Sequence, residues 1–135
     1  MLASGLPERV DDDEDLARFL TSTSQFNAQM AKPSAFLPSA KDHETSVFRH
    51  GNEPRATLWA IGDQYAAGNR TIRGAAIVKA REVRAAMLEI IAVEPPPRHA
   101  AIRSWPRDDD PELQKAQQKE RALQVASKAA LLLRQ

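Results

Sequence analysis

The 135-residue sequence has no cysteine, only five glycines, and few aromatic residues, which make up 5% of the chain. Without cysteine the chain has neither a disulfide framework nor a thiolate metal site. No apolar run approaches the roughly 20 residues that span a bilayer. The first residues also lack the basic and apolar regions of a secretory signal. We therefore expect a cytoplasmic protein with no membrane partner.

What the chain does contain is a composition typical of a globular domain. Apolar residues make up 42% and charged residues 27%, and the formal net charge is +1. A length of 135 residues suits a single hydrophobic core. The composition therefore predicts one small domain over residues 1–135.

Charge is unevenly distributed along the chain. Residues 1–31 carry six acidic and two basic residues, residues 32–107 carry seven and twelve, and residues 108–135 carry five of each. Two interpretations stay open for the acidic arm over about residues 1–12, whose order the sequence does not decide. Its carboxylates begin the first helix, where they favour the positive end of the helix dipole, or the arm covers a basic surface or docks on a basic partner.

The segment after this arm has the spacing of a short helix. Leu16, Phe19 and Leu20 recur at intervals of three and four, and Asp11 to Asp13 offer capping carboxylates before them. We therefore predict that the chain enters its first helix here. The following residues 26–40 hold two prolines and predict an extended segment on the core.

Strands are predicted where β-branched and aromatic residues gather between turn residues. They cover residues 45–49, 71–78 and 88–93, with one further short strand within 99–105. Gly74 indicates a bulge or a close backbone approach. A helix of suitable length connects 45–49 to 71–78, which favours a parallel crossover between these two strands.

Helices are predicted from their terminal residues. Pro54 and Gly68 bracket a helix over 54–67, and residues 79–86 are strong helix formers. Asp110 and Pro111 begin a long helix over 111–134. The expected fold is α+β, or mixed α/β, with a three- to four-stranded sheet packed by helix 54–67 and the C-terminal helix. The predicted core comprises Phe36, Val47, Phe48, Leu58, Ile61, Ile77, Val78, Leu88, Ile90, Val93, Ile102, Leu123 and Leu131.

The predicted C-terminal helix has an unusually wide apolar surface. A helix packed on one sheet needs an apolar stripe only somewhat wider than 100°. The surplus is buried in the chain's own core or against a partner; its mixed polar face disfavours a membrane surface. The candidate partner-binding residues are Leu123, Ala126, Ala130, Leu132 and Leu133.

Two Arg-His dipeptides are the candidates for chemistry. Arg49-His50 and Arg98-His99 each lie at the end of a predicted strand. An arginine fork binds phosphate or carboxylate, and a neighbouring histidine exchanges protons near neutral pH. If the strand ends meet, they form an anion site with a general base. The alternative is a structural role, in which the arginines pair with carboxylates such as Glu53 or Glu94.

Metal and cofactor motifs are absent from the sequence. His43, His50 and His99, or two of them with Asp42 or Glu44, could supply zinc ligands, but their spacing fits no helical metal motif. The scattered glycines form no phosphate-binding loop, and no G-x-S-x-G elbow surrounds a serine. We therefore predict neither a metal nor a cofactor.

A basic central region is the candidate for nucleic acid. Its residues are Arg70, Arg73, Lys79, Arg81 and Arg84, and Trp59, Trp105 and Phe48 could stack on bases. The near-neutral net charge and the lack of a dense basic run argue against this function.

The sequence therefore favours a non-enzymatic accessory or adaptor subunit. It would bind a protein partner, or a second copy of itself, through the C-terminal apolar helix. An enzyme acting on a phosphate-bearing or other anionic substrate through the Arg-His pairs is the first alternative. Nucleic-acid binding is the second.

Overall fold

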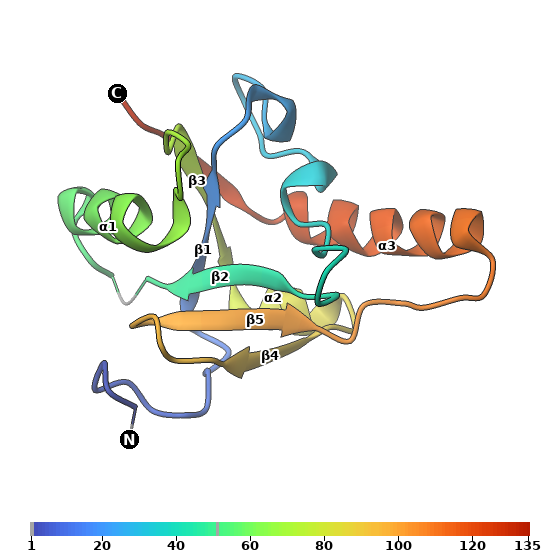
Figure 1. The fold of residues 1–135 in the computed structure, drawn as a ribbon, viewed down its shortest axis with the longest axis horizontal. Coiled ribbons are helices and arrows are strands. Elements are labelled where there is room, and N and C mark those ends of the chain that lie inside the picture. Colours follow the sequence, from blue (N-terminus) through green and yellow to red (C-terminus); the bar gives the residue numbers. More distant parts are fainter. Residues whose placement is uncertain (1, 51) are drawn as a thin grey trace.

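The computed structural model describes residues 2–50 and 52–135, which form a six-stranded sheet with the order β4-β5-β2-β1-β3-β6 (Figure 1). Every neighbouring pair is antiparallel. The fold is α+β as predicted, but the sheet is larger than the three to four strands expected. Its strands are β1 (Asp15–Leu20), β2 (Thr45–Arg49), β3 (Gly74–Lys79), β4 (Glu89–Ala92), β5 (His99–Arg103) and β6 (Ala130–Leu133).

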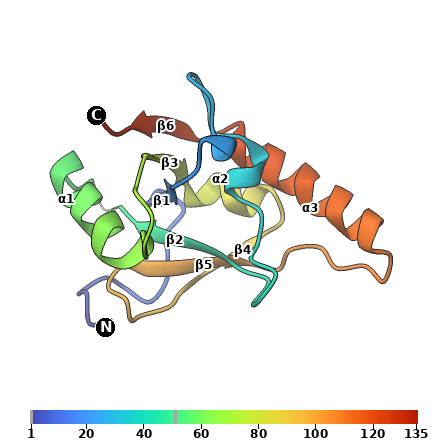
Figure 2. The same ribbon diagram turned by 45° about the horizontal axis from the view of Figure 1, so that its top comes forward.

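Helices cover both faces of this sheet. On one face lies α1 (Arg55–Ile61), which continues into a π-helical turn, η3 (Gly62–Ala66). The other face is covered by α2 (Ala80–Ala85) and α3 (Pro111–Ala126), together with a 3₁₀ turn, η2 (Pro33–Ala35). Figure 2 shows α1 and α3 on opposite sides of the strands.

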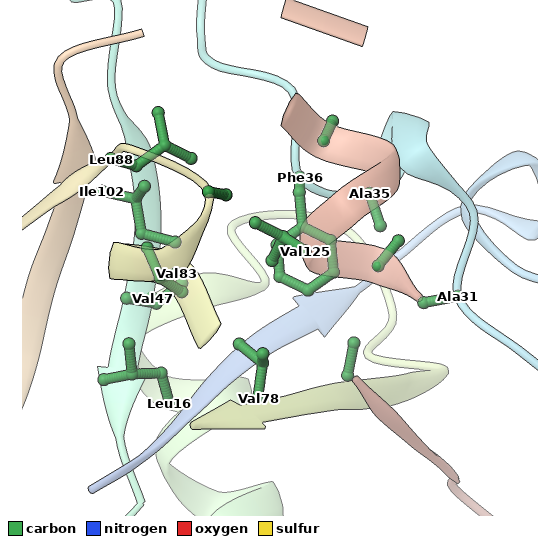
Figure 3. Packing of buried hydrophobic residues seen from close by; sticks show 14 of the residues in the cluster. Leu16, Ala31, Ala35, Phe36, Val47, Val78, Val83, Leu88, Ile102 and Val125 are labelled. Carbon is green, nitrogen blue, oxygen red and sulfur yellow. The ribbon is translucent and has the colours of Figure 1, made fainter. Parts of the chain in front are cut away.

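Two apolar clusters result from this layering. The larger one lies between the sheet and the α2, α3 and η2 side, where Val83 and Val125 approach Leu16 and Val78 (Figure 3). The smaller one lies under α1 and includes Phe19 and Phe48. Strand β1, which lies inside the sheet between β2 and β3, therefore buries side chains on both of its faces.

The structure corrects the prediction of a first helix. Residues 15–20 form strand β1, with Leu16 and Leu20 on the larger cluster and Ala17 and Phe19 on the smaller one. A strand buried on both faces has no polar alternation, so its apolar run satisfies helical spacing equally well. The preceding aspartates cap no helix.

The structure also corrects the C-terminal helix. α3 begins at Pro111 as predicted, with the Asp110 side chain accepting a hydrogen bond from Glu112 N at 3.0 Å, but it ends at Ala126 rather than 134. After a short turn, β6 pairs with β3. No proline or glycine marks this break. The apolar residues after Ala129 are helix formers locally, and pairing with β3 overrides that preference.

The other predicted elements occur close to their expected positions. The strand over 45–49 is confirmed, and those over 71–78, 88–93 and 99–105 are confirmed with shifted ends. The helix over 54–67 is divided between α1 and η3. Since β1 is antiparallel to both β2 and β3, those two strands run parallel, but β1 lies between them.

Gly74 marks a close approach, as expected. A Cβ atom at this position would lie 2.6 Å from the carbonyl oxygen of Leu132. Most predicted core residues are buried or half-buried, but Val93 is 38% exposed and Leu123 is 51% exposed. Leu123 is excluded from the core because the sheet covers only one side of α3.

Candidate functional site

The two Arg-His dipeptides lie next to each other, because β2 and β5 pair with Phe48 opposite His99. The backbone N–H of Arg49 donates to the carbonyl of Arg98 at 2.7 Å, and Arg98 Nη1 donates to the carbonyl of Arg49 at 3.1 Å. The topology thus brings together the strand ends that the sequence singled out.

The guanidinium of Arg49 is turned toward the N-terminal segment. It is 1% exposed, and its Nε and Nη2 donate to the two carboxylate oxygens of Glu14 at 2.7 and 2.8 Å. Nη1 donates to the carbonyl of Pro7 at 2.6 Å. Burial alone would raise the pKa of Glu14, but the hydrogen bonds and charge of Arg49 lower it below its ordinary value. Arg49 therefore fixes the arm to the sheet.

The guanidinium of Arg98 also has protein partners. Nη2 donates to Glu53 Oε1 at 2.7 Å, and Nη1 reaches the carbonyl of His50 at 3.3 Å. The backbone N–H of Arg98 donates to Glu94 Oε2 at 3.0 Å. These contacts match the structural alternative, in which the arginines pair with carboxylates, and they leave neither fork directed at a shared anion.

The two histidines of these dipeptides have different surroundings. Nδ1 of His50 is buried without a hydrogen-bond partner among the residues that the structure describes. The ring of His99 lies edge-on to Phe48, 5.3 Å between centroids, with Nδ1 2.9 Å from the carbonyl of Val93 and Nε2 2.5 Å from Ser46 Oγ. Because a carbonyl oxygen can only accept, Nδ1 carries the proton. In the neutral ring, Nε2 then accepts from the Ser46 hydroxyl.

Arg18, which the sequence analysis did not single out, lies beside this Ser-His pair. Its Nε donates to the carbonyl of Ala35 at 2.7 Å and its Nη1 to the carbonyl of Ser46 at 2.9 Å. Burial lowers the pKa of Arg18. No carboxylate oxygen of the described residues lies within 4.0 Å of its guanidinium. Arg18 lies inside the apolar run of β1, and nothing in the sequence marks it as a functional residue.

The histidines do not converge on a metal site. His43 Nε2 lies 3.0 Å from the side-chain amide of Gln118 on α3, whereas His99 Nε2 lies 2.5 Å from Ser46 Oγ. Across residues 2–50 and 52–135, no group of three or more histidine or acidic side chains is arranged to hold a metal ion.

The acidic segment over residues 11–15 neutralises part of the basic central region. Three of the five candidate residues form ion pairs with it: Lys79 with Asp15 at 3.0 Å, Arg84 with Asp12 at 2.5 Å, and Arg81 with Asp13. The other two, Arg70 and Arg73, are exposed and precede β3.

The aromatic residues considered for stacking are not freely exposed. Phe48 and Trp105 are buried, and half-buried Trp59 lies under the guanidinium of Arg134, 5.7 Å from the ring centroid. Positive charge and aromatic surface therefore do not combine here in the way that base stacking requires.

The five candidate partner-binding residues are divided between α3 and β6. Ala126 is buried in the larger cluster, whereas Leu123 points outward from α3. In β6, Leu132 packs on the smaller cluster, while Ala130 is exposed and Leu133 is 41% exposed. The apolar surface is therefore the edge of a sheet together with an isolated leucine, instead of one side of a continuous helix.

No protein-family model, curated protein sequence or solved structure matches this chain. No helix of the described residues combines the length and apolar character that crossing a membrane requires.

Proposed function

We propose that this protein is an accessory or adaptor subunit that binds a protein partner by adding one of the partner's strands to β6. The observation that supports this function is the free edge of β6, which is the last strand of the sheet order. An edge strand presents unpaired backbone donors and acceptors to another chain.

The ladder with β3 identifies which backbone groups are free. The N–H of Arg134 donates to the carbonyl of Arg73 at 3.0 Å, and Leu133 is opposite Gly74. In an antiparallel pair, hydrogen-bonded and non-hydrogen-bonded positions alternate. Leu132 therefore bonds to β3, whereas the N–H and C=O groups of Leu131 and Leu133 point away from it.

The side chains of this edge suit an apolar partner strand. Ala130 to Leu133 include no charge and no proline, the features that usually protect an edge. Leu133 also lines a pocket of about 450 Å³ together with Phe26 and Ile72. An extended apolar segment could place backbone groups on β6 and one side chain in this pocket.

A proline at the edge tests strand addition. In Leu133→Pro the outward N–H is lost while the β3–β6 ladder keeps its bonds, since that N–H does not take part in it. We expect this variant to stay folded but to lose binding to apolar peptides selected on the wild-type protein from a random display library. Self-association, measured by sedimentation, should be lost likewise if the partner is a second copy.

The matched control is Leu133→Ala, which removes the side chain but keeps the N–H. It should weaken binding less than the proline does. The proposal fails if the wild-type protein neither self-associates nor selects peptides, or if alanine and proline have equal effects.

A second candidate function, an acyl-transfer enzyme, is supported by the Ser46–His99 hydrogen bond. A neutral imidazole that accepts from a serine hydroxyl is arranged as a general base for a nucleophile. In acyl transfer, Ser46 Oγ would attack the acyl carbon and its proton would pass to His99 Nε2. The bond to the leaving group would break as His99 Nε2 passes that proton to the leaving group, and water would then hydrolyse the acyl-serine.

Release of p-nitrophenol from p-nitrophenyl acetate tests this candidate. Ser46→Ala and His99→Gln should each lower the rate of release at least about tenfold, since general-base catalysis contributes 10²–10⁴-fold. Ser34→Ala is the control, because exposed Ser34 donates to the carbonyl of Ser24, away from the pair, and its loss should leave the rate unchanged. Equal rates in all four proteins would exclude Ser46 as a nucleophile.

A further inference from the structure

Arginines in this protein are commonly neutralised by carboxylates. Arg49 pairs with Glu14, Arg98 with Glu53, and Arg134 with Asp63. Arg18 differs, because its half-buried side chain bonds, among the described residues, only to two backbone carbonyls. A desolvated charge without a counter-ion is unfavourable. Burial therefore lowers the pKa of Arg18, because it disfavours the charged guanidinium.

A pocket of about 340 Å³ is located beside Arg18. Arg70 also lines it, and Thr21, Tyr65 and Asn69 add neutral hydrogen-bonding side chains. Among the described residues that line this pocket, none is aspartate or glutamate. Two positive charges and several donors thus meet in a space that holds no negative charge of the protein.

Local structure explains how the wall carrying Arg70 forms. The ring of Tyr65 stacks on Phe48, 6.5 Å between centroids, and fixes the end of η3 over the sheet. The chain then reverses at Gly68, whose φ of 60° lies in the left-handed region. The backbone N–H of Arg70 donates to the carbonyl of Ala67 at 2.9 Å and completes the turn.

We propose that this pocket binds the anionic group of a small molecule, a phosphate or a carboxylate, between Arg18 and Arg70. Guanidinium groups bind such oxygens through charge-assisted hydrogen bonds. The bound anion gives Arg18 a negative partner, which no carboxylate of the described residues provides within 4.0 Å. A pocket of this volume lies in the range typical of small-molecule sites.

The neighbouring surface gives the anion a direction. Asp42 and Glu44 line a second pocket that shares Arg18 and Ser46 with the first. Their charges would repel an anion, so it binds on the side of Arg70. The site is independent of β6, and although it shares Ser46 with the second candidate function, phosphate binding requires no turnover.

This site is tested by titrating the full chain with inorganic phosphate at constant ionic strength and measuring the heat of binding by calorimetry. We expect saturable binding to one site, weakened at least about tenfold in Arg70→Gln and in Arg18→Gln, because a hydrogen bond to a charged group contributes on that scale. Arg70 is exposed, so Arg70→Gln decides the matter should Arg18→Gln fail to fold. A parallel titration with succinate distinguishes a carboxylate from a phosphate ligand, and binding of either supports the site.

The control is Arg73→Gln, which removes the same charge from an exposed arginine three residues away that lines a different pocket. It should bind phosphate within about twofold of the wild-type protein, as expected for a surface charge outside the site. An equal loss in Arg73→Gln and Arg70→Gln would overturn the proposal, since general surface attraction would then explain binding. So would the absence of saturable binding of both phosphate and succinate to the wild-type chain.

Discussion

At the scale of single residues, the arginines show that the same type of side chain has different partners at different positions. Arg49 and Arg98 were candidates for an anion site, and both donate instead to carboxylates and carbonyls of the protein. No sequence pattern marks Arg18 as functional. It nevertheless lines a polar pocket, and its guanidinium has no carboxylate partner among the described residues. The residue type indicates which partners an arginine can bind, whereas the position of the nearest carboxylate decides which it does bind.

The Arg49–Glu14 pair predicts a large loss of stability on removal of one partner. Glu14→Gln leaves the buried guanidinium without a counter-charge, which typically costs about 3–5 kcal/mol. Urea unfolding followed by circular dichroism should show this decrease in the free energy of unfolding. Asp11→Asn, at an exposed carboxylate 3.8 Å from Arg9, is the control and should change stability by less than about 1 kcal/mol.

At the scale of elements, the sequence predicts the structure correctly where local chemistry decides. Pro54 and Gly68 bracket the helical segment, and Asp110 caps α3 as its position before Pro111 indicated. The helix predictions for β1 and β6 are wrong because both are apolar segments without a proline or glycine to break a helix. Their strand conformation depends on β3, to which both are paired.

The Asp110 cap provides a test at this scale. Asp110→Ala removes the hydrogen bond to the N–H of Glu112 and should lower the free energy of unfolding by about 1 kcal/mol. Thermal unfolding measures the change. Asp109→Ala is the neighbouring control, because no hydrogen bond of its side chain to the backbone is formed among the described residues. Equal effects of the two substitutions would show that lost negative charge, instead of the cap, is responsible.

At the scale of the whole molecule, the acidic segment is the feature that joins distant parts of the chain. Glu14 contacts β2, and Asp12 and Asp13 contact the α2 region. These contacts correspond to the interpretation in which the acidic residues cover a basic surface. They also place several carboxylates in contact with arginine or with backbone donors.

The pKa values of these carboxylates predict acid sensitivity. Burial raises the pKa of Glu14, but the hydrogen bonds from Arg49 and the Asp11 backbone, with the nearby arginine charges, together lower it. Burial likewise raises the pKa of Glu94, but hydrogen bonds from Ser4 and the Arg98 backbone, with the charge of Arg49, together lower it. A carboxylate with a lower pKa in the folded state binds fewer protons than in the unfolded chain. Its stabilisation is therefore present above its ordinary value of 4.5 and is lost as the pH falls through its folded-state pKa.

Unfolding by urea at a series of pH values checks this expectation. The unfolding midpoint should be nearly constant from about pH 7 to pH 5.5 and should decline below about pH 4.5. Glu14→Gln should show a shallower decline, because one of the titrating groups is gone. A midpoint that rises on acidification would contradict the prediction.

The sequence by itself determined the mixed helix-and-strand class, strand β2 and the start of α3, because the last two depend on neighbouring residues. At Gly74 it indicated a bulge or a close backbone approach, and tertiary structure decided that the approach is to the carbonyl oxygen of Leu132. Tertiary structure alone decided that residues 15–20 form the central strand and that residues 130–133 form an edge. It also decided that Ser46 bonds to His99, although 53 residues separate them. The physical reason is that strand pairing joins residues remote in sequence, and its energy exceeds the small local preferences that a sequence pattern expresses.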